Sequence, residues 1–370
     1  MILSYKYRIE PNRTQAAALG EMLADFCQLY NAGLEQRIDA WRRRHISVTY
    51  KMQADELKAV RCAAPGLARW SFTAEQQVLR RLDKTFKAFF ARGRGFPRFR
   101  ARARFHAAEF RVGDGLTIRK SGKLGFVGVP GEIRVRWHRE LPSKPKSAIL
   151  TRQAGKWYVV FHVEVDAVER ASPDSIGIDF GLSSLIALSD GHTVPRPNWT
   201  KRAARELRRR QRAIARCKRG STTRAKRKAA LARFHARVAA KRRDHLHKIS
   251  RDLVDRFGRI AIEDLNVKGL ASGMLAKHVH DASWAQLTAM LDYKAARAGV
   301  ELVKVDPRGT SQTCPQCGTI RAKTLAEREH RCDCGCRLDR DVAAAMVVHY
   351  RAFGFWPGTG LGTLSEPVAA

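Results

Sequence analysis

The amino-acid sequence predicts a protein of the α/β class in three successive parts. Apolar residues recur at helical spacing over residues 12–90, and apolar and polar residues alternate over residues 110–166, as expected for a helical part followed by strands with one buried face. From residue 175 to residue 305, short apolar segments alternate with longer helical ones, which is typical of strands joined by helices. The 370 residues are enough for two or three domains of ordinary size.

The composition excludes several classes of protein. Hydrophobic residues make up 44% of the chain, which favours a folded core over disorder. The net charge of +35 favours a polyanionic partner, and nucleic acid before a membrane surface. The chain has no run of 18 apolar residues, and its N-terminal segment lacks the apolar stretch of a signal peptide. We therefore expect a protein without a membrane span.

The first part is predicted to be a helical bundle. Leu19, Leu23, Phe26, Tyr30 and Leu34 recur every three or four residues, so they share one face of a helix. Packing in a core is a sufficient role for these side chains.

Glycine and proline interrupt the helical pattern in residues 91–105, where arginines and phenylalanines interleave. The arginines are Arg92, Arg94, Arg98, Arg100, Arg102 and Arg104. A solvated charged surface is one interpretation. Nucleic-acid binding is favoured, because phenylalanines between arginines can stack on bases.

Period-two alternation predicts the strands of the second part. Ile133, Val135 and Trp137 alternate with polar residues, and residues 157–165 alternate in the same way. Glycine and proline between such segments indicate antiparallel strands. One small sheet or barrel is the expected product.

The third part contains three short strand signals. Residues 175–191 (SIGIDFGLSSLIALSDG) predict a strand, a tight turn and a second strand, whereas residues 258–265 and 301–305 each predict one strand. A helix is expected at residues 284–298 and another from Asp341 onwards. Strands and helices in this order predict an α/β domain.

Residues 201–250 are the most basic segment. They contain 20 lysines and arginines but only two acids, Glu206 and Asp244. A thin apolar stripe is compatible with long helices. A solvated face is one interpretation, but so many like charges favour a nucleic-acid partner. The candidate contacts here are Arg208, Arg209, Arg210, Lys226, Arg227 and Lys228.

The cysteine cluster is the strongest local signal. Five of the eight cysteines lie between Cys314 and Cys336, and Cys314-Pro-Gln-Cys317-Gly has the spacing of a zinc knuckle. The second knuckle is an irregular C-x-C-G-C. We expect Cys332 and Cys334 to complete a tetrahedral site, because Cys334 precedes a glycine as Cys317 does, and Cys336 is the alternative fourth ligand. Four thiolates form a closed, structural zinc site.

Three acidic positions are candidates for chemistry. Asp179 ends a strand pattern, Glu263 ends another, and Asp339 and Asp341 open the last helix. Each alone can be a turn residue, a strand-edge charge or a helix N-cap. Together, three converging carboxylates could hold two divalent ions, which clamp the attacking water and the leaving oxygen of a phosphodiester. Mg²⁺ prefers such carboxylate ligands.

The order of these motifs resembles a known family. The segments GIDFGLSSLIALSDG, IAIEDLNVKGL, TSQTCPQCG and CGCRLDRDVAAA resemble the TnpB transposon-encoded proteins, which are similar to type V CRISPR effector nucleases. The resemblance is close over residues 175–348, and looser in the N-terminal half, through YRIEPN and FPRF.

The resemblance implies an RNase H-like (RuvC) nuclease domain with an inserted zinc ribbon, preceded by a small β-barrel that carries a helical insertion. It implies that Asp179, Glu263 and Asp341 bind two catalytic Mg²⁺ ions, beside one structural Zn²⁺. Asp341 is chosen over Asp339 because the catalytic acid of the family precedes an x-N-A-A stretch. Ala343 stands here in place of that asparagine.

The expected domains follow from the resemblance. They are a β-barrel domain (residues 1–11 and 91–170), a helical recognition domain (12–90), a RuvC-like domain (174–305 and 339–350) with a basic helical insertion (198–255), a zinc ribbon (306–338) and a flexible tail (351–370).

The function that the resemblance implies is RNA-guided DNA cleavage for a mobile element. The expected partners are a guide RNA from the transposon end and target double-stranded DNA with a short adjacent motif. The expected location is the prokaryotic cytoplasm at the nucleoid. The oligomeric state stays open between a monomer, which is favoured, and a dimer. Two alternatives stay open: a nuclease-inactive, RNA-guided repressor, and an RNA-independent transposase or junction resolvase.

Overall fold

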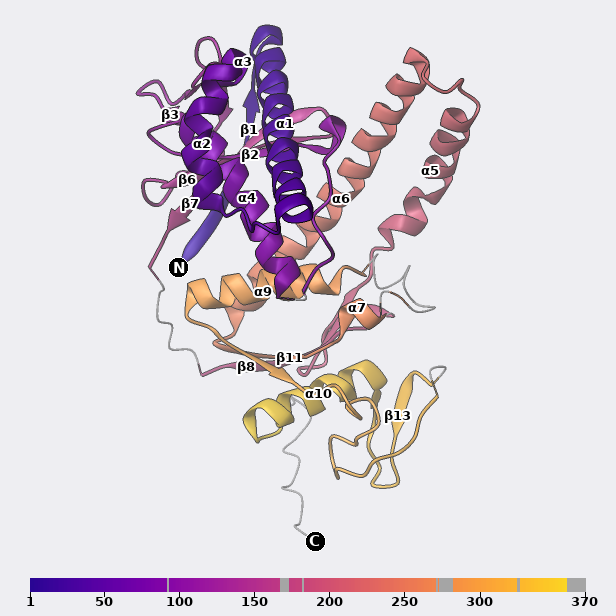
Figure 1. Ribbon diagram of the computed structural model, residues 1–370. Helices are drawn as coiled ribbons and strands as arrows, with labels where there is room; N and C mark the ends of the chain where they lie inside the picture. Colours follow the sequence, from indigo (N-terminus) through magenta and orange to yellow (C-terminus); the bar gives the residue numbers. More distant parts are fainter. Residues whose placement is uncertain are drawn as a thin grey trace. The chain divides into compact units, whose positions relative to one another are not determined.

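The computed structural model describes residues 1–91, 93–166, 173–181, 183–270, 272, 282–324 and 327–357. Two compact units, Met1–Val165 and Asp166–Ala370, divide the chain (Figure 1). Arg92 and the end of the predicted tail, from residue 358, lie outside the described residues.

Strand β1 (Ile2–Glu10) opens the first unit, and four helices separate it from the next strand. They are α1 (Arg13–Arg44), α2 (Tyr50–Ala63), α3 (Pro65–Ala68) and α4 (Phe72–Phe90). Helix α1 begins at a capping box, in which Asn12 Oδ1 accepts from the Gln15 amide at 2.8 Å and Gln15 Oε1 accepts from the Asn12 amide at 3.0 Å. The predicted apolar stripe of this helix is buried. The helical prediction for residues 12–90 is confirmed.

The other elements of this unit are the 3-10 helix η1 (Arg102–Arg104) and the strands β2 (Ala107–Arg111), β3 (Leu116–Ile118), β4 (Leu124–Phe126), β5 (Arg134–Arg136), β6 (Ser147–Gln153) and β7 (Lys156–Glu164). Five strands form an antiparallel sheet in the order β2-β6-β7-β1-β5, and β3 and β4 form a separate hairpin. Two isolated bridges join the hairpin to the edge strands of the sheet. Val112, just after β2, pairs with Leu116 of β3, and Leu124 of β4 pairs with Ile133, just before β5. The hairpin is thus linked to both edge strands of the sheet, and the small β-barrel stays a prediction.

The second unit contains a mixed sheet in the order β10-β9-β8-β11-β12. Its strands are β8 (Ser175–Asp179), β9 (Ser184–Leu188), β10 (Thr193–Pro195), β11 (Arg259–Glu263) and β12 (Glu301–Val305). Strands β8, β9 and β10 pair antiparallel, whereas β11 pairs parallel with both β8 and β12. The strand, turn and strand predicted for residues 175–191 form the β8–β9 hairpin.

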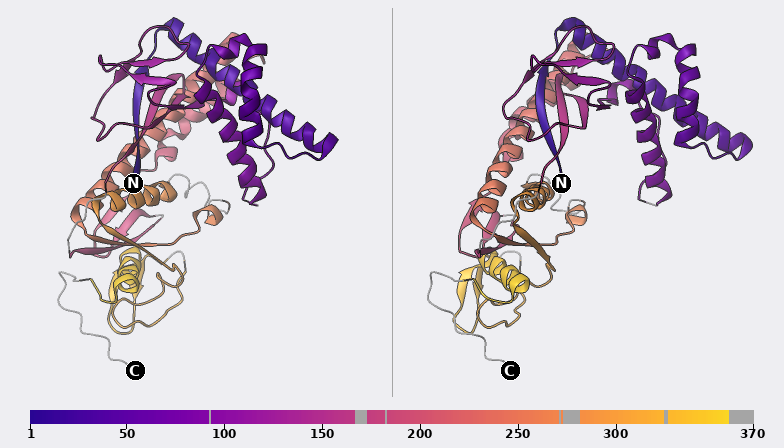
Figure 2. Two further views of the ribbon diagram at one scale, coloured as in Figure 1. Left: turned by 60° about the vertical axis from the view of Figure 1, so that its left-hand side comes forward. Right: turned by 90° about the vertical axis from the view of Figure 1, so that its left-hand side faces the viewer.

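Helices cover both faces of this sheet, so the unit has three layers (Figures 1 and 2). Helices α6 (Thr222–Arg256) and α9 (Trp284–Ala298) pack on one face, where Ile178 and Ile262 join their apolar side chains in one core. Helix α10 (Arg340–Phe353) packs on the other face, where Val348 meets Ala261. The α/β class predicted for this part is confirmed.

Helix α10 lies unusually close to strand β8. A methyl group built on Gly177 would lie 2.2 Å from the Ala345 carbonyl oxygen, so only glycine fits there. A hydrogen bond between Ser175 Oγ of β8 and His349 Nε2 of α10, 2.7 Å apart, also joins this helix to this strand. These contacts set the position of α10 against the strand that carries Asp179.

Three smaller features complete the unit. Helix α5 (Trp199–Ala215) pairs with α6 in a helical hairpin, so the basic segment forms long helices, as its apolar stripe allowed. The hairpin of β13 (Glu329–Arg331) and β14 (Arg337–Asp339) lies between β12 and α10, in the cysteine-rich segment. The short helix α7 (Val267–Leu270) follows β11.

Candidate active site and metal centre

Two of the three candidate acids lie side by side at the ends of parallel strands. Asp179 is the last residue of β8 and Glu263 the last of β11. The register pairs Ile178 with Ile262, so the next positions are the two acids. Because side chains alternate along a strand, Asp179 shares the face of Gly177, which is the face covered by α10. The carboxyl ends of parallel strands in such sheets are common ligand sites.

Helix α10 brings the third acid to the same place. The Asp339 carboxylate caps this helix, where its Oδ1 accepts from the amides of Asp341 and Val342 at 2.9 and 3.1 Å. The Asp341 carboxylate points instead to the turn after β8, where a methyl built on Gly181 would lie 2.9 Å from its Oδ2. The two acids of the DRD motif thus have different positions: Asp339 caps α10, and Asp341 faces the turn after β8.

The acid cluster is electrostatically strained. Burial raises the pKa of Asp179 well above its usual value, and the negative charges of Glu263 and Asp341 raise it further. Burial also raises the pKa of Glu263, although hydrogen bonds from Thr310 and Asp179 oppose that rise. Without a cation, burial therefore favours the protonated forms of Asp179 and Glu263. A divalent ion would supply the positive charge that stabilises their ionised forms.

The spacing of the acids does not fit the chelation of one ion by all three. Among the described residues, groups of three or more potential ligands whose atoms all lie within 4.8 Å of one another involve only cysteines and His330. Two ions about 3.5–4 Å apart would each need part of a carboxylate set. Hard carboxylate oxygens are the donors that Mg²⁺ prefers, so the residues present fit a pair of such ions.

Two polar residues beside the acids were not predicted as site residues. Thr310 Oγ donates to Glu263 Oε1 at 2.6 Å, and Arg340 Nη2 lies 3.3 Å from Asp341 Oδ1. Both residues belong to motifs that carry the family resemblance, TSQTCPQCG and DRD. That membership is the only sequence signal that could have identified them, because a hydroxyl and a guanidinium occur in many structural roles.

Ala343 is buried within α10. It lies in a run of three buried alanines, Ala343–Ala345, and the last of these contacts Gly177 closely. Small side chains let this helix approach the sheet. The departure from the family pattern therefore falls at a packed position, while the acid two residues earlier keeps its place.

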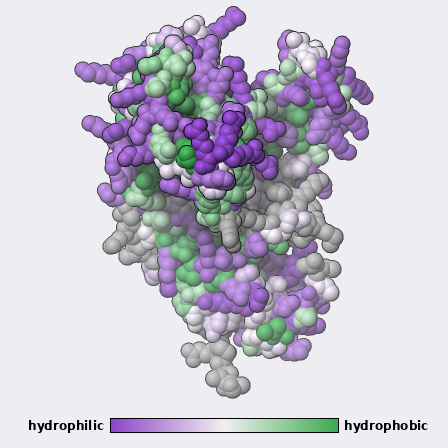
Figure 3. All heavy atoms as spheres, in the orientation of Figure 1, coloured by the Kyte–Doolittle hydropathy of each residue, from purple (hydrophilic) through white to green (hydrophobic). Residues whose placement is uncertain are grey.

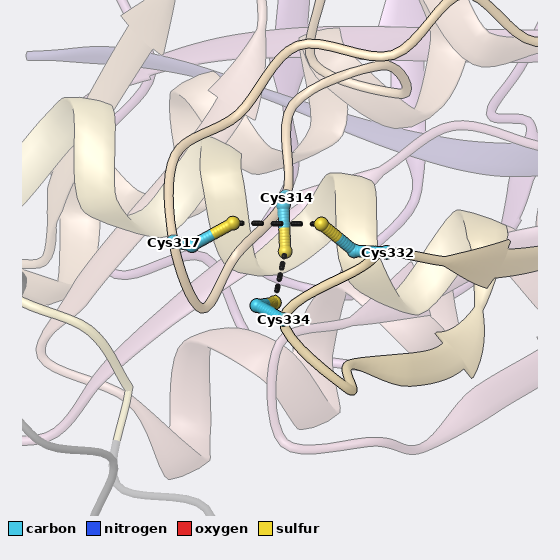
Figure 4. Close-up of side chains that lie close together, drawn as sticks. All are labelled: Cys314, Cys317, Cys332 and Cys334. Atoms are coloured by element: carbon cyan, nitrogen blue, oxygen red, sulfur yellow. Dashed lines mark hydrogen bonds between the residues drawn. The ribbon is translucent and has the colours of Figure 1, made fainter.

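The cysteine knuckles form a four-sulfur cluster (Figure 4). The Sγ atoms of Cys314 and Cys334 are 3.7 Å apart, and those of Cys317 and Cys332 are 3.5 Å apart. A tetrahedral zinc ion with Zn–S bonds of about 2.3 Å requires S–S separations of about 3.8 Å. The four thiols therefore fit one structural zinc ion.

Cys336, the alternative fourth ligand, lies outside this cluster. Its Sγ belongs to a second group of potential ligands, which shares the Sγ of the buried Cys314 and adds a ring nitrogen of the buried His330. His330 Nδ1 contacts Lys323 Nζ. A cation beside the imidazole disfavours a second divalent ion there, so we assign the zinc to the four-sulfur group.

The predicted arginines of the first unit are exposed along residues 94–104. Asn31 fixes this segment to α1, since its Nδ2 donates to the Arg100 carbonyl at 2.9 Å and its Oδ1 accepts from the Arg100 amide at 2.8 Å. Phe96 and Phe99 are 49% and 57% exposed. An anchored segment thus presents both cations and aromatic rings to the solvent.

The α5–α6 hairpin carries an open basic depression of about 510 Å³, and hydrophilic side chains cover its outer end (Figure 3). The depression is lined by Arg205, Arg208, Arg209, Arg212, Ala213 and Arg216. Among the predicted contacts, all but Arg210 are exposed, and Arg209 pairs with Glu206. Arg210 packs over the Phe234 ring, and Arg227 donates to the Ala213 carbonyl at 2.6 Å. These last two side chains have structural contacts within the hairpin.

Comparisons with known proteins agree with this arrangement. The family model described as "Probable transposase" matches residues 158–273, and the "Cas12f1-like, TNB domain" model matches residues 284–348. A "Helix-turn-helix domain" model matches residues 1–45, which form strand β1 and the single helix α1. No described helix has the length and apolarity needed to cross a membrane.

Two curated relatives are named "Putative RNA-guided DNA endonuclease". One, from Streptomyces pristinaespiralis, is 35% identical over 93% of this chain and 88% of its own. The other, InsQ of Escherichia coli (strain K12), is 29% identical over 70% of this chain and 68% of its own. A solved structure titled "Cryo-EM structure of the Cas12f1-sgRNA-target DNA complex" shares the fold, with a TM-score of 0.59 and 12% identity over 90% of this chain and 82% of that one.

The fold and the matched models define a transposase-related protein whose α/β fold is shared with the Cas12f1 structure. The extent of its identity to the Streptomyces relative is decisive. The chain belongs to the TnpB family, as its motifs predicted.

Proposed function

We propose that this protein is an RNA-guided, Mg²⁺-dependent DNA endonuclease of a transposable element. The observation that carries the proposal is the convergence of Asp179, Glu263 and Asp341 on one edge of the sheet, from two strands and a helix. The names of the curated relatives support the choice of DNA as substrate and RNA as guide.

In this proposal the three carboxylates hold two Mg²⁺ ions. Bound there, the ions would activate a water molecule and stabilise the leaving oxygen of the phosphodiester, so a separate general base is unnecessary. Asp179 and Glu263 would bind the ions as carboxylates, so each must first lose the proton that burial favours. Arg340 holds Asp341 at the start of α10.

The basic surfaces would hold nucleic acid through its phosphates. In the first unit, residues 94–104 combine arginines with exposed phenylalanines, which suits unpaired bases. In the second unit, the arginine-lined depression of α5 suits a duplex backbone. We further propose that residues 12–90 are the recognition domain, and that the zinc ribbon is structural.

The proposal is tested by purifying the protein together with its RNA and assaying the complex for DNA cleavage. The protein would be expressed with the transcript of the flanking transposon end, and any bound RNA would be sequenced. The complex would then be incubated with Mg²⁺ and a plasmid library that carries the target beside random flanks. Guide-dependent cutting, abolished by Asp179→Ala, is the expected result.

Other outcomes would favour the alternatives. If the complex binds its target without cutting it, the RNA-guided repressor replaces the nuclease as the proposed function. Ala343→Asn would then be the first substitution to test for restored cutting. Cutting of branched DNA by RNA-free protein would replace the guided model by a junction resolvase.

A further inference from the structure

The zinc ribbon begins and ends beside the acid cluster. Its first segment, after β12, carries Thr310 four residues before the zinc ligand Cys314. Its last strand, β14, ends at Asp339, the residue that caps α10 and precedes Asp341 by two positions. The chain therefore passes from one acid contact to another through the ribbon.

The contact at the first end is specific. Thr310 is 4% exposed and Glu263 is 7% exposed, so water competes little for their hydrogen bond. Thr310 Oγ lies 2.6 Å from Glu263 Oε1 and 3.0 Å from the Pro307 carbonyl oxygen. A hydroxyl has one proton, and the shorter contact to a carboxylate is the stronger use of it.

Helix α10 holds the loop that presents Thr310. Arg351 Nη1 donates to the carbonyls of Asp306 and Arg308 at 2.8 and 2.7 Å. Thr313 Oγ donates to the Gly309 carbonyl at 2.9 Å, which tightens the turn before the first knuckle. The Thr310 hydroxyl is thus fixed from both sides, by α10 and by the ribbon.

We propose that Thr310 is a positioning residue that orients the Glu263 carboxylate for metal binding, and that the zinc ribbon sets the spacing of Glu263 and Asp341 through its two ends. Thr310 contacts the ligand and not the reacting atoms. The zinc ion would then serve the catalytic site by holding the loop and β14 together. This inference rests on the proposed nuclease function.

Paired variants test the hydroxyl. Thr310→Val keeps the shape of the side chain and removes its donor, whereas Thr310→Ser keeps the donor. We expect Thr310→Val to raise the Mg²⁺ concentration for half-maximal guided cleavage roughly tenfold or more, and Thr310→Ser to stay within about twofold of wild type. Thr324→Val, which removes an exposed hydroxyl of the ribbon that donates to Glu327 Oε1 at 2.9 Å, is the matched control. Equal losses in Thr310→Val and Thr310→Ser, or no loss in either, would overturn the role of Thr310.

Mn²⁺ binding to the RNA-free full-length protein, followed by electron paramagnetic resonance, provides a readout that does not need cleavage. Thr310→Val should weaken this binding by a similar factor, with unchanged zinc content. If the wild type fails to cut but the Mn²⁺ shift appears, the positioning role stands and the nuclease proposal falls. If zinc-free Cys317→Ser protein binds Mn²⁺ as tightly as wild type, the ribbon does not set the spacing of the acids.

Discussion

The acid cluster and the cysteine cluster lie in the same unit but are built in opposite ways. The four zinc thiols come from two turns within 21 residues of chain, whereas the three acids come from two strands and a helix, with Asp179 and Asp341 at opposite ends of the domain sequence. Of the four thiols, Cys317 and Cys334 are exposed, whereas Glu263 and Asp341 are buried and Asp179 is half-buried. One site is a local motif, and the other exists only when the sheet and α10 pack together.

The two clusters also differ in their electrostatic state. Closed thiolate sites of this kind stabilise a fold, because the metal contributes folding free energy. Buried acids that repel one another cost stability until a cation arrives. We therefore expect removal of a zinc ligand to cost structure, and neutralisation of an acid to cost activity alone.

The largest effect should come from the DRD pair. Asp341→Asn should lower guided cleavage by roughly a thousandfold or more, because the reacting ions lose a ligand. Asp339→Asn should stay within a few-fold of wild type, since asparagine also caps helices well. Single-turnover cleavage rates measure both. A larger loss for Asp339→Asn would reverse our assignment of the two acids.

The second effect concerns the zinc ligands. Cys317→Ser and Cys334→Ser should each lose the zinc ion, whereas Cys336→Ser should keep it. The zinc content of purified protein, measured by mass spectrometry, decides between them. Zinc retained in Cys334→Ser but lost in Cys336→Ser would show that the knuckle uses the other thiol.

A third effect should come from the arginines of α5. Replacing Arg205, Arg208 and Arg212 together by serine should reduce the dependence of RNA affinity on salt, by about 0.7–0.9 in log–log slope for each phosphate that the variant no longer neutralises. The control is Lys248→Ser with Arg251→Ser, because Asp244 and Asp255 already neutralise those cations. Equal slopes in all three proteins would exclude this depression as the RNA surface.

The smallest effect is on the stability of metal-free protein. The folded pKa of Asp179 lies above its unfolded value, so the folded state binds more protons and loses stability as pH rises through that window. Asp179→Asn should therefore raise the melting temperature at pH 7 by a few degrees, roughly 2–4 °C for each kcal/mol. The difference should vanish near pH 3, where aspartate is protonated in both states. A lower melting temperature at pH 7 would contradict the strain we describe.

The Mg²⁺ concentration needed for cleavage should also depend on pH. Because burial raises the pKa of Asp179 and Glu263, protons compete with Mg²⁺ for these carboxylates. The Mg²⁺ concentration for half-maximal cleavage should rise as pH falls, at pH values where solvated carboxylates remain ionised. Measuring it at several pH values tests this competition.

The sequence by itself determined the parts with short-range patterns. Helical periodicity placed α1 and α9, alternation placed β7 and β11, and C-x-x-C spacing located the zinc knuckle, because each of these depends on neighbours a few residues apart. The order of the acids and the zinc knuckles along the chain was enough to predict the family.

Only the tertiary structure decided the rest. The parallel register of β8 and β11 sets Asp179 beside Glu263, and the close packing of α10 on Gly177 brings Asp341 to the same edge of the sheet. The hydrogen bond from Thr310 to Glu263 spans 47 residues. No local pattern encodes such contacts, because they depend on how sheet and helix pack, and packing is a property of the whole unit.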